Sequence, residues 1–217
     1  MSRRRMMNKL PDKGETISLF HCDDNYGTDS KGFATPSSRS LGAVYGRYSL
    51  GNSGYIQYKD NQWDEILLGG PWTVDYWIYP RSCSTWACDV FLGGNSSYDA
   101  IIRCQTNYSV SSISFFISGG RGWVINGYKA SVTNDSWNHV AITYDTNTCK
   151  IYIDGILNKS FNMTITNICG PLNFFGRGPS SPENNDAKSN SYRDEIRISR
   201  GVRWMSNFNP PNGPYVD

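Results

Sequence analysis

The segment WTVDYWIYP, residues 72–80, constrains the fold more than any other part of the chain. Its side chains alternate, so Val74, Tyr76 and Ile78 share one face and the residues between them share the other. Pro80 then ends the pairing, because proline has no N–H to donate to a neighbouring strand. A two-residue period of this kind predicts a β-strand, and one of Tyr76 and Trp77 must point into a core.

Similar short segments recur along the chain, and no stretch shows a long 3.6-residue apolar period, so we expect almost no helix. Asp154-Gly155 lies between β-forming residues and is a strong hairpin signal. Further strands are expected within 17–24, 46–60, 89–94, 98–105, 112–120, 137–145, 149–160, 172–178 and 192–199. The pattern therefore predicts an all-β, two-sheet antiparallel sandwich.

The composition agrees with one such domain. The chain has 217 residues, of which 18% are charged and 14% aromatic, which is typical of all-β proteins rich in turns. A formal net charge of +2 is too small for a general nucleic-acid binder. No window approaches the ~20 apolar residues that a membrane-spanning helix needs, so we expect neither nucleic acid nor membrane as a partner.

Residues 1–15 are polar and basic, and we interpret them as an arm before a sandwich domain at 16–217. The arm carries the candidate partner-binding residues Arg3, Arg4, Arg5, Met6 and Met7. Two interpretations stay open: the arm docks into a partner, or it is a solvated tail. Its basic start is not followed by an apolar run of signal-peptide length.

The six cysteines contain no C-x-x-C pair, which argues against zinc-ribbon and thioredoxin-like sites. We expect them to be free thiols that act as small apolar side chains. Cys83 and Cys88 are the only close pair, and the sequence leaves open whether they form a disulfide.

Four segments together resemble the laminin-G-like branch of the concanavalin A-like lectin/glucanase superfamily. They are SLFHCDD (18–24), WTVDYWIYP, SWNHVAITYD with KIYIDGIL (136–157), and the closing YRDEIRISRGVRWMSNFNPP (192–211). The resemblance covers the chain except for the arm, and it implies a concanavalin A-like jelly roll. Superfamily members include enzymes, lectins, adhesion domains and virion proteins, so the fold alone does not give the function.

The closing segment resembles domains of phage tail and head appendage proteins. With no secretion signal, this favours a bacteriophage virion module made in the host cytoplasm, docked to other virion proteins and part of a homo-oligomer or larger assembly. Glycans are a further expected partner. The alternative is a soluble or cell-surface carbohydrate-binding lectin or adhesion domain.

Catalytic chemistry is not expected. Glycosidases of this fold carry same-face carboxylates spaced as E-x-D-x-x-E, and the chain has no such run. Asp194 and Glu195 are adjacent and should point to opposite faces, while Asp75 and Asp154 stand alone on their strands. His21 and His139 are interpreted as structural, so we expect no enzyme.

No cofactor motif is present either. Asp23, Asp24 and Asp29 cluster near one loop, but their spacing matches no known calcium loop, and carboxylates in loops usually cap turns. The sequence therefore predicts no metal site.

Aromatic side chains near turns are the remaining candidates for a ligand site. Sugars stack their apolar faces on aromatic rings while planar polar groups bind their hydroxyls. We therefore predict a glycan site from one set of aromatic and arginine side chains: Trp86, Tyr98, Arg103, Arg121, Trp123 and Tyr128.

Overall fold

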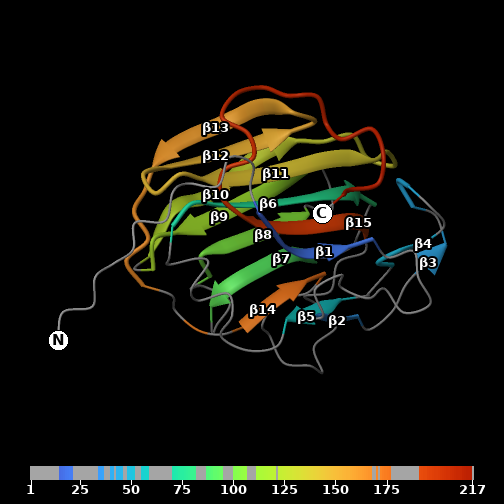
Figure 1. The fold of residues 1–217 in the computed structure, drawn as a ribbon, viewed down its shortest axis with the longest axis horizontal. Helices are drawn as coiled ribbons and strands as arrows, with labels where there is room; N and C mark the ends of the chain where they lie inside the picture. Colours follow the sequence, from blue (N-terminus) through green and yellow to red (C-terminus); the bar gives the residue numbers. More distant parts are fainter. Residues whose placement is uncertain are drawn as a thin grey trace.

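The computed structural model has two antiparallel sheets and a separate two-stranded ribbon (Figure 1). It describes residues 15–21, 34–36, 40–41, 43–45, 48–51, 55–58, 70–81, 87–94, 100–106, 111–120, 122–167, 170, 172–176 and 191–216. No helix occurs in these ranges, so none of them contains a helical membrane span. The expected all-β class is confirmed.

The six-stranded sheet has the order β1 (Glu15–Phe20), β15 (Tyr192–Arg200), β6 (Trp72–Tyr79), β11 (Asn138–Tyr144), β12 (Thr148–Ile153) and β13 (Ile156–Asn162). The seven-stranded sheet has the order β10 (Trp123–Ser131), β9 (Ser112–Ser118), β8 (Ile102–Thr106), β7 (Ala87–Gly94), β14 (Leu172–Phe175), β5 (Ile56–Tyr58) and β2 (Ala34–Pro36). The ribbon pairs β3 (Ser40–Leu41) with β4 (Tyr48–Ser49).

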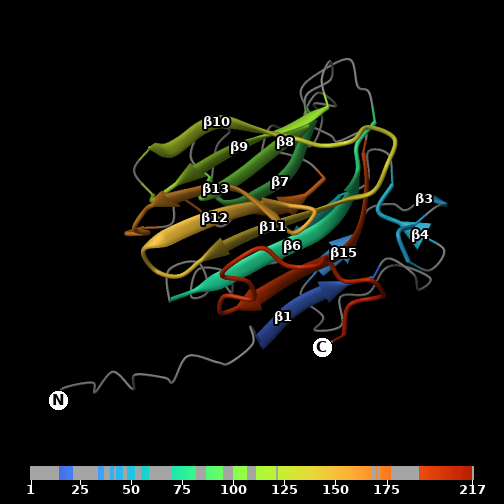
Figure 2. The ribbon, with the colours of Figure 1, turned by 90° about the horizontal axis from the view of Figure 1, so that it is seen from above.

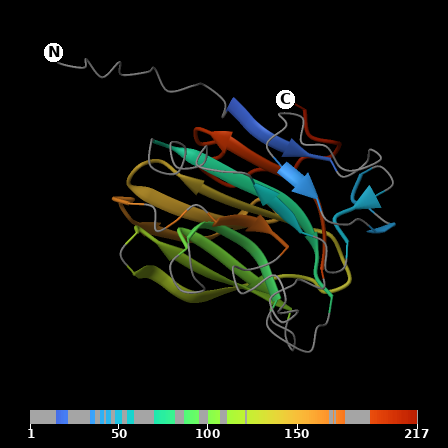
Figure 3. The same ribbon diagram turned by 90° about the horizontal axis from the view of Figure 1, so that it is seen from below.

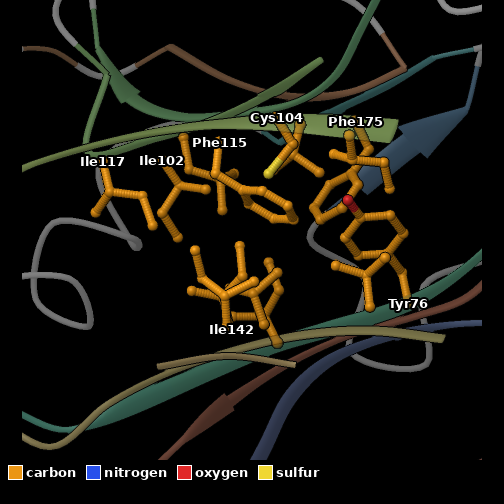
Figure 4. Packing of buried hydrophobic residues seen from close by; sticks show 14 of the residues in the cluster. Tyr76, Ile102, Cys104, Phe115, Ile117, Ile142 and Phe175 are labelled. Atoms are coloured by element: carbon orange, nitrogen blue, oxygen red, sulfur yellow. The ribbon is translucent and has the colours of Figure 1, made fainter. Parts of the chain in front are cut away.

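The two large sheets form two layers with the core between them (Figures 2 and 3). Tyr76 confirms the alternation expected for β6, because it is fully buried and makes an edge contact with Phe175 of the opposite sheet, with ring centroids 5.6 Å apart. Figure 4 shows Tyr76 and Ile142 pointing from one sheet toward Phe115 and Phe175 on the other. Trp77 therefore faces outward.

The hairpin at Asp154-Gly155 is also confirmed. Both residues have positive φ angles, 50° and 76°, which a tight turn between right-twisted strands requires. The Asp154 carboxylate accepts the backbone N–H of His139 at 2.8 Å, so it fixes the turn against the neighbouring strand β11.

A β-bulge in β15 overturns one expectation. Asp194 pairs with Trp77 and Arg197 with Asp75, so two residues of β15 oppose the single residue Tyr76. Glu195, one of the two, has a φ of 49°. The extra residue interrupts the alternation, so Asp194 and Glu195 both lie on the outer face although they are adjacent and were expected on opposite faces.

Strand β10 was not expected from the sequence. Its Asn126-Gly127 pair looks like a turn signal, but in the structure Gly127 lies at a register shift with a φ of 76°. A glycine with positive φ is as typical of a bulge as of a turn. Within 46–60, two short strands do form, but β4 and β5 belong to different sheets.

Residues 201–216, which we call the C-terminal strap, contain no strand and lie on the outer face of the six-stranded sheet (Figure 2). The Phe208 N–H donates to the carbonyl of Gly155 at 2.9 Å. A Cβ on Gly155 would lie 1.9 Å from the Phe208 carbonyl oxygen, so this approach requires glycine.

Cys88, Cys104 and Cys149 are buried free thiols, as expected, so Cys88 does not pair with Cys83. The other cysteines lie outside the described residues. So does the arm up to residue 14, since β1 begins at Glu15. Docking of the arm therefore stays a prediction.

Candidate functional site

The structure describes half of the predicted glycan site. Trp86, Tyr98 and Arg121 lie outside the described residues. Arg103 is on β8, and Trp123 and Tyr128 are on β10, where all three are half-buried. The structure brings Arg103 and Trp123 together and separates Tyr128 from them.

Arg103 and Trp123 meet on the outer face of the seven-stranded sheet. Ile102 and Cys104 point into the core, so the strand period turns Arg103 outward. Its register partner on β9 is Phe116, and Phe116 in turn pairs with Asn126 of β10. One row across three strands therefore carries a guanidinium, an aromatic ring and an amide.

Phe116 is the centre of this surface. The guanidinium carbon of Arg103 lies 5.3 Å from the Phe116 ring centroid on one side. The Trp123 ring, from the strand on the other side of β9, lies 5.6 Å from the Phe116 ring at an interplanar angle of 59°. We call Arg103, Gln105, Phe116, Trp123 and Asn126 the outer platform.

Two polar groups of the outer platform, Arg103 and Gln105, hold each other in place. With its amide oriented to accept, the Gln105 oxygen lies 2.6 Å from Nη2 of Arg103. Gln105 is buried, whereas Asn126 is exposed. A fixed guanidinium and amide next to aromatic faces can bind hydroxyl groups while the rings accept the apolar face of a sugar.

A small apolar cluster supports the platform from the side. Trp123 packs with Tyr55 against the buried residues Cys88, Phe91 and Ala100. Burial raises the pKa of the Cys88 thiol to about 12, so this support remains uncharged at neutral pH. Trp123 therefore has one packed face and a position fixed by the fold.

Tyr128 belongs to a different environment. It pairs with the core residue Phe115, and the two ring centroids are 6.5 Å apart. Its hydroxyl donates to the Asn158 carbonyl at 2.9 Å, and the Lys159 ammonium lies 5.5 Å from its ring centroid. Tyr128 therefore bridges the rims of the two sheets.

The sequence reasoning missed Phe116, Gln105 and Asn126. A signal for Phe116 was present, because Phe115 and Phe116 are adjacent in a strand and one of them must face outward.

A cluster of charged and titratable side chains lies beneath the strap. Arg197 makes a bidentate contact with Asp75, at 3.1 Å from Nε and 2.8 Å from Nη2. His139 Nε2 lies 2.8 Å from the Tyr215 hydroxyl and 3.5 Å from the Asp75 carboxylate. Although burial disfavours the charged form of Asp75, Arg197 and His139 hold its pKa below the usual value.

Asp194 and Glu195 both contribute to this outer side, contrary to the expectation that they point to opposite faces. Glu195 accepts the Tyr215 N–H at 2.6 Å and lies 2.8 Å from Nδ1 of His21. Asp194 accepts the Val44 N–H at 3.0 Å. Burial and the nearby Glu195 raise the pKa of Asp194 to about 8.

These groups hold the strap rather than line an open cleft. Asp75, His139, Asp194 and Glu195 are fully buried, and they contact backbone N–H groups and the side chains of arginine, histidine and tyrosine. Among the described residues, no set of three or more metal-ligating side chains comes together. The loop with Asp23, Asp24 and Asp29 lies outside those residues, so the metal prediction stays open.

Solved structures share this fold at low identity. The botulinum neurotoxin serotype D binding domain matches with a TM-score of 0.64 and 14% identity over 87% of this chain and 48% of that one. This chain thus spans less than half of that binding domain. A mutant sialidase of Trypanosoma rangeli matches with a TM-score of 0.63 and 10% identity, over 86% of this chain and 31% of that one.

Domain 4 of AbnA, an extracellular arabinanase of Geobacillus stearothermophilus solved with arabinotriose, is similar over nearly its full length. It matches with a TM-score of 0.64 and 18% identity over 88% of this chain and 95% of that one. At these identities the likeness shows the fold. The comparison with curated protein sequences found no match.

A family model carries the assignment. The laminin-G-type model described as concanavalin A-like lectin/glucanases superfamily matches residues 50–204, which is most of the chain. The match contains strands of both sheets and the outer platform. The chain therefore belongs to the laminin-G-like branch of the concanavalin A-like lectin/glucanase superfamily.

Proposed function

We propose that this protein is a non-enzymatic carbohydrate-binding module that holds its ligand on the outer platform. The observation that carries the proposal is the row Arg103–Phe116–Asn126, with Trp123 packed at 5.6 Å from Phe116. Two aromatic rings at an angle offer faces to a sugar, and the guanidinium and the amides offer planar donors and acceptors.

The burial of the carboxylates beneath the strap supports the non-enzymatic part of this proposal. A glycosidase needs an acid and a base that both reach the scissile bond from an open cleft. Asp194 and Glu195 share one side, but both are fully buried and bind backbone N–H groups of the chain itself. Hydrolysis would require the strap to leave this face.

The experiment is a panel of neutral polysaccharides and oligosaccharides tested with the full chain. Trp123→Ala should weaken binding of the preferred saccharide roughly fivefold or more, because one stacked ring is lost. Val124→Ala, at the exposed neighbour on the same strand, is the matched control and should bind normally. Equal binding by wild type and Trp123→Ala, at unchanged melting temperature, would show that the outer platform is not the saccharide-binding site.

A more specific proposal is that the module is part of a bacteriophage virion, docked to other virion proteins. The resemblance of the closing segment 192–211 to phage appendage domains supports it. In this proposal the basic arm attaches the chain to the other virion proteins, and the sandwich projects outward from them. Incorporation into particles of a variant lacking residues 2–9 tests the attachment, with the melting temperature of that variant as the control. Normal incorporation would overturn it.

A further inference from the structure

The outer face of the six-stranded sheet carries an aromatic row that the outer platform does not use. Tyr79 ends β6 and pairs with Tyr192, the first residue of β15. Trp137 directly precedes β11, whose first residue Asn138 pairs with Ile78. Three neighbouring strands therefore place one aromatic residue each at the same end of the sheet.

Neighbouring rings of this row contact each other. The centroids of Tyr79 and Trp137 are 5.6 Å apart, and those of Tyr79 and Tyr192 are 5.8 Å apart. These steps follow the strand spacing of about 4.8 Å, because each ring stands on a different strand. All three residues are half-buried, so each keeps some accessible surface for a ligand.

Arg81 ends the row on the side of Tyr192. Its guanidinium carbon lies 5.2 Å from the Tyr192 ring centroid, and Nη1 donates to the Tyr192 hydroxyl at 3.0 Å. The buried Arg193 and Arg197 each face a carboxylate, Asp89 and Asp75. Within the described part of the chain, by contrast, no carboxylate lies within 4.0 Å of the half-buried Arg81.

Within the described residues, the strap has no ring contact or hydrogen bond with the rings at this end of the face. Its aromatic residues Trp204, Phe208 and Tyr215 pack on His139, which follows Trp137 by two residues and lies on the same face. Among the described residues, the ring contacts and hydrogen bonds of Trp137 and Tyr192 are with Tyr79 and Arg81, not with the strap. Among the described residues, the strap thus packs on the part of the face around His139 and not on the part around Trp137 and Tyr192.

We propose that Trp137, Tyr79, Tyr192 and Arg81 form a second saccharide-binding surface, which takes an extended anionic oligosaccharide. The rings stack on successive sugar faces, and Arg81 pairs with a carboxylate or sulfate group of the ligand. A saccharide fits better than a protein partner, because the large exposed apolar side chains of the described residues are elsewhere, at Val124, Ile156, Leu157, Met205 and Val216. A protein interface needs an apolar centre of larger area.

This inference is independent of the outer platform, because the two surfaces are on opposite sheets that face away from each other (Figure 2). If both bind, one chain holds two saccharides at once and gains avidity on a polymer that reaches both faces.

The test measures binding of the full chain to immobilised polygalacturonate, dextran sulfate and neutral dextran. Arg81→Gln should weaken binding to the anionic polymer about tenfold and leave any binding to dextran unchanged. Trp137→Ala should weaken it roughly fivefold, and Trp137→Phe should restore most of the loss, because a ring returns. Preference between polygalacturonate and dextran sulfate identifies the carboxylate or the sulfate as the partner of Arg81.

Two controls separate this surface from general charge and from the outer platform. Arg200→Gln removes one exposed positive charge from the same strand β15 and should leave binding unchanged. Trp123→Ala should also leave it unchanged, whatever it does to neutral sugars. The proposal would be overturned if Arg200→Gln lost as much binding as Arg81→Gln, or if Trp123→Ala alone lost binding. Unaltered binding in both Arg81→Gln and Trp137→Ala would also overturn it. So would competition by polyglutamate as strong as that by polygalacturonate. So would the absence of binding to either anionic polymer.

Discussion

The Tyr215 ring lies under the guanidinium of Arg197, with the guanidinium carbon 3.9 Å from the ring centroid. Arg197 belongs to β15 and Tyr215 to the end of the strap, so this contact attaches the end of the strap to the second strand of the six-stranded sheet. Asp75 binds the same guanidinium from β6. The strap therefore covers the ion pair between Arg197 and Asp75, which would otherwise face solvent.

Replacing Tyr215 should detach the end of the strap. Tyr215→Ala removes a buried ring, the cover over Arg197 and the hydroxyl next to His139. We expect a loss of about 3–5 kcal/mol in the free energy of unfolding, measured by chemical denaturation. Val216→Ala, at a residue that is 79% exposed, should stay within about 0.5 kcal/mol of wild type. Similar stability for both variants would show that the strap is not needed.

The close approach of the strap to the hairpin gives a second prediction. Gly155→Ala adds a Cβ that would overlap the Phe208 carbonyl oxygen, whereas Gly122→Ala meets nothing within 4 Å. Both glycines have positive φ, 76° and 91°, so both variants carry a backbone strain of about 1–2 kcal/mol. The melting temperature should therefore fall clearly further in Gly155→Ala. Equal decreases would mean that backbone strain alone accounts for both.

The position of Tyr76 in the core gives a third prediction. Tyr76→Ala opens a cavity against Phe175 of the opposite sheet and should cost about 3–5 kcal/mol of stability. Tyr79→Ala on the same strand is the matched control, because Tyr79 is half-buried on the other face. It should cost less than half as much in the same denaturant titration. A larger loss for Tyr79→Ala would reverse the assignment of the two faces.

The two-residue period of β6 was sufficient to predict that one of Tyr76 and Trp77 faces the core, because burial of one face requires that alternation. The structure shows that it is Tyr76. The Asp154-Gly155 turn was predictable for a similar reason, since few residue pairs tolerate two positive φ angles. Neither pattern depends on distant parts of the chain.

The bulge at Glu195 and the strap were not predictable in this way. Glu195 has no residue-type signal for a positive φ, and its carboxylate is held by Tyr215 and His21, which are far from it in sequence. At the candidate site, Arg103 and Trp123 were found, but their meeting over Phe116 depends on the register of β8, β9 and β10. Local periodicity does not fix that register.

The bulge has a consequence for the pH dependence of stability. Burial, with Glu195 close by, raises the pKa of Asp194 from 3.8 to about 8. The folded state then holds a proton that the unfolded state releases between these values, so stability falls as pH rises through this window, by at most ~1.4 kcal/mol per pH unit.

Asp194→Asn removes this titration and keeps an oxygen that can accept the Val44 N–H. Denaturant titrations of both proteins from pH 4 to pH 8 should therefore show the stability of wild type decreasing relative to the variant. Curves that run parallel across this range would mean that Asp194 is not protonated in the folded protein.

The central claim is that the outer platform binds a saccharide without cleaving it. The most direct measurement is an NMR titration of the 15N-labelled full chain with the neutral oligosaccharide that binds best in the panel. We predict that the largest shifts fall on Phe116, Asn126 and the Trp123 indole, and that the oligosaccharide is recovered intact. Largest shifts at the strap or at the 154–156 hairpin, or release of shorter sugars during the titration, would contradict the account.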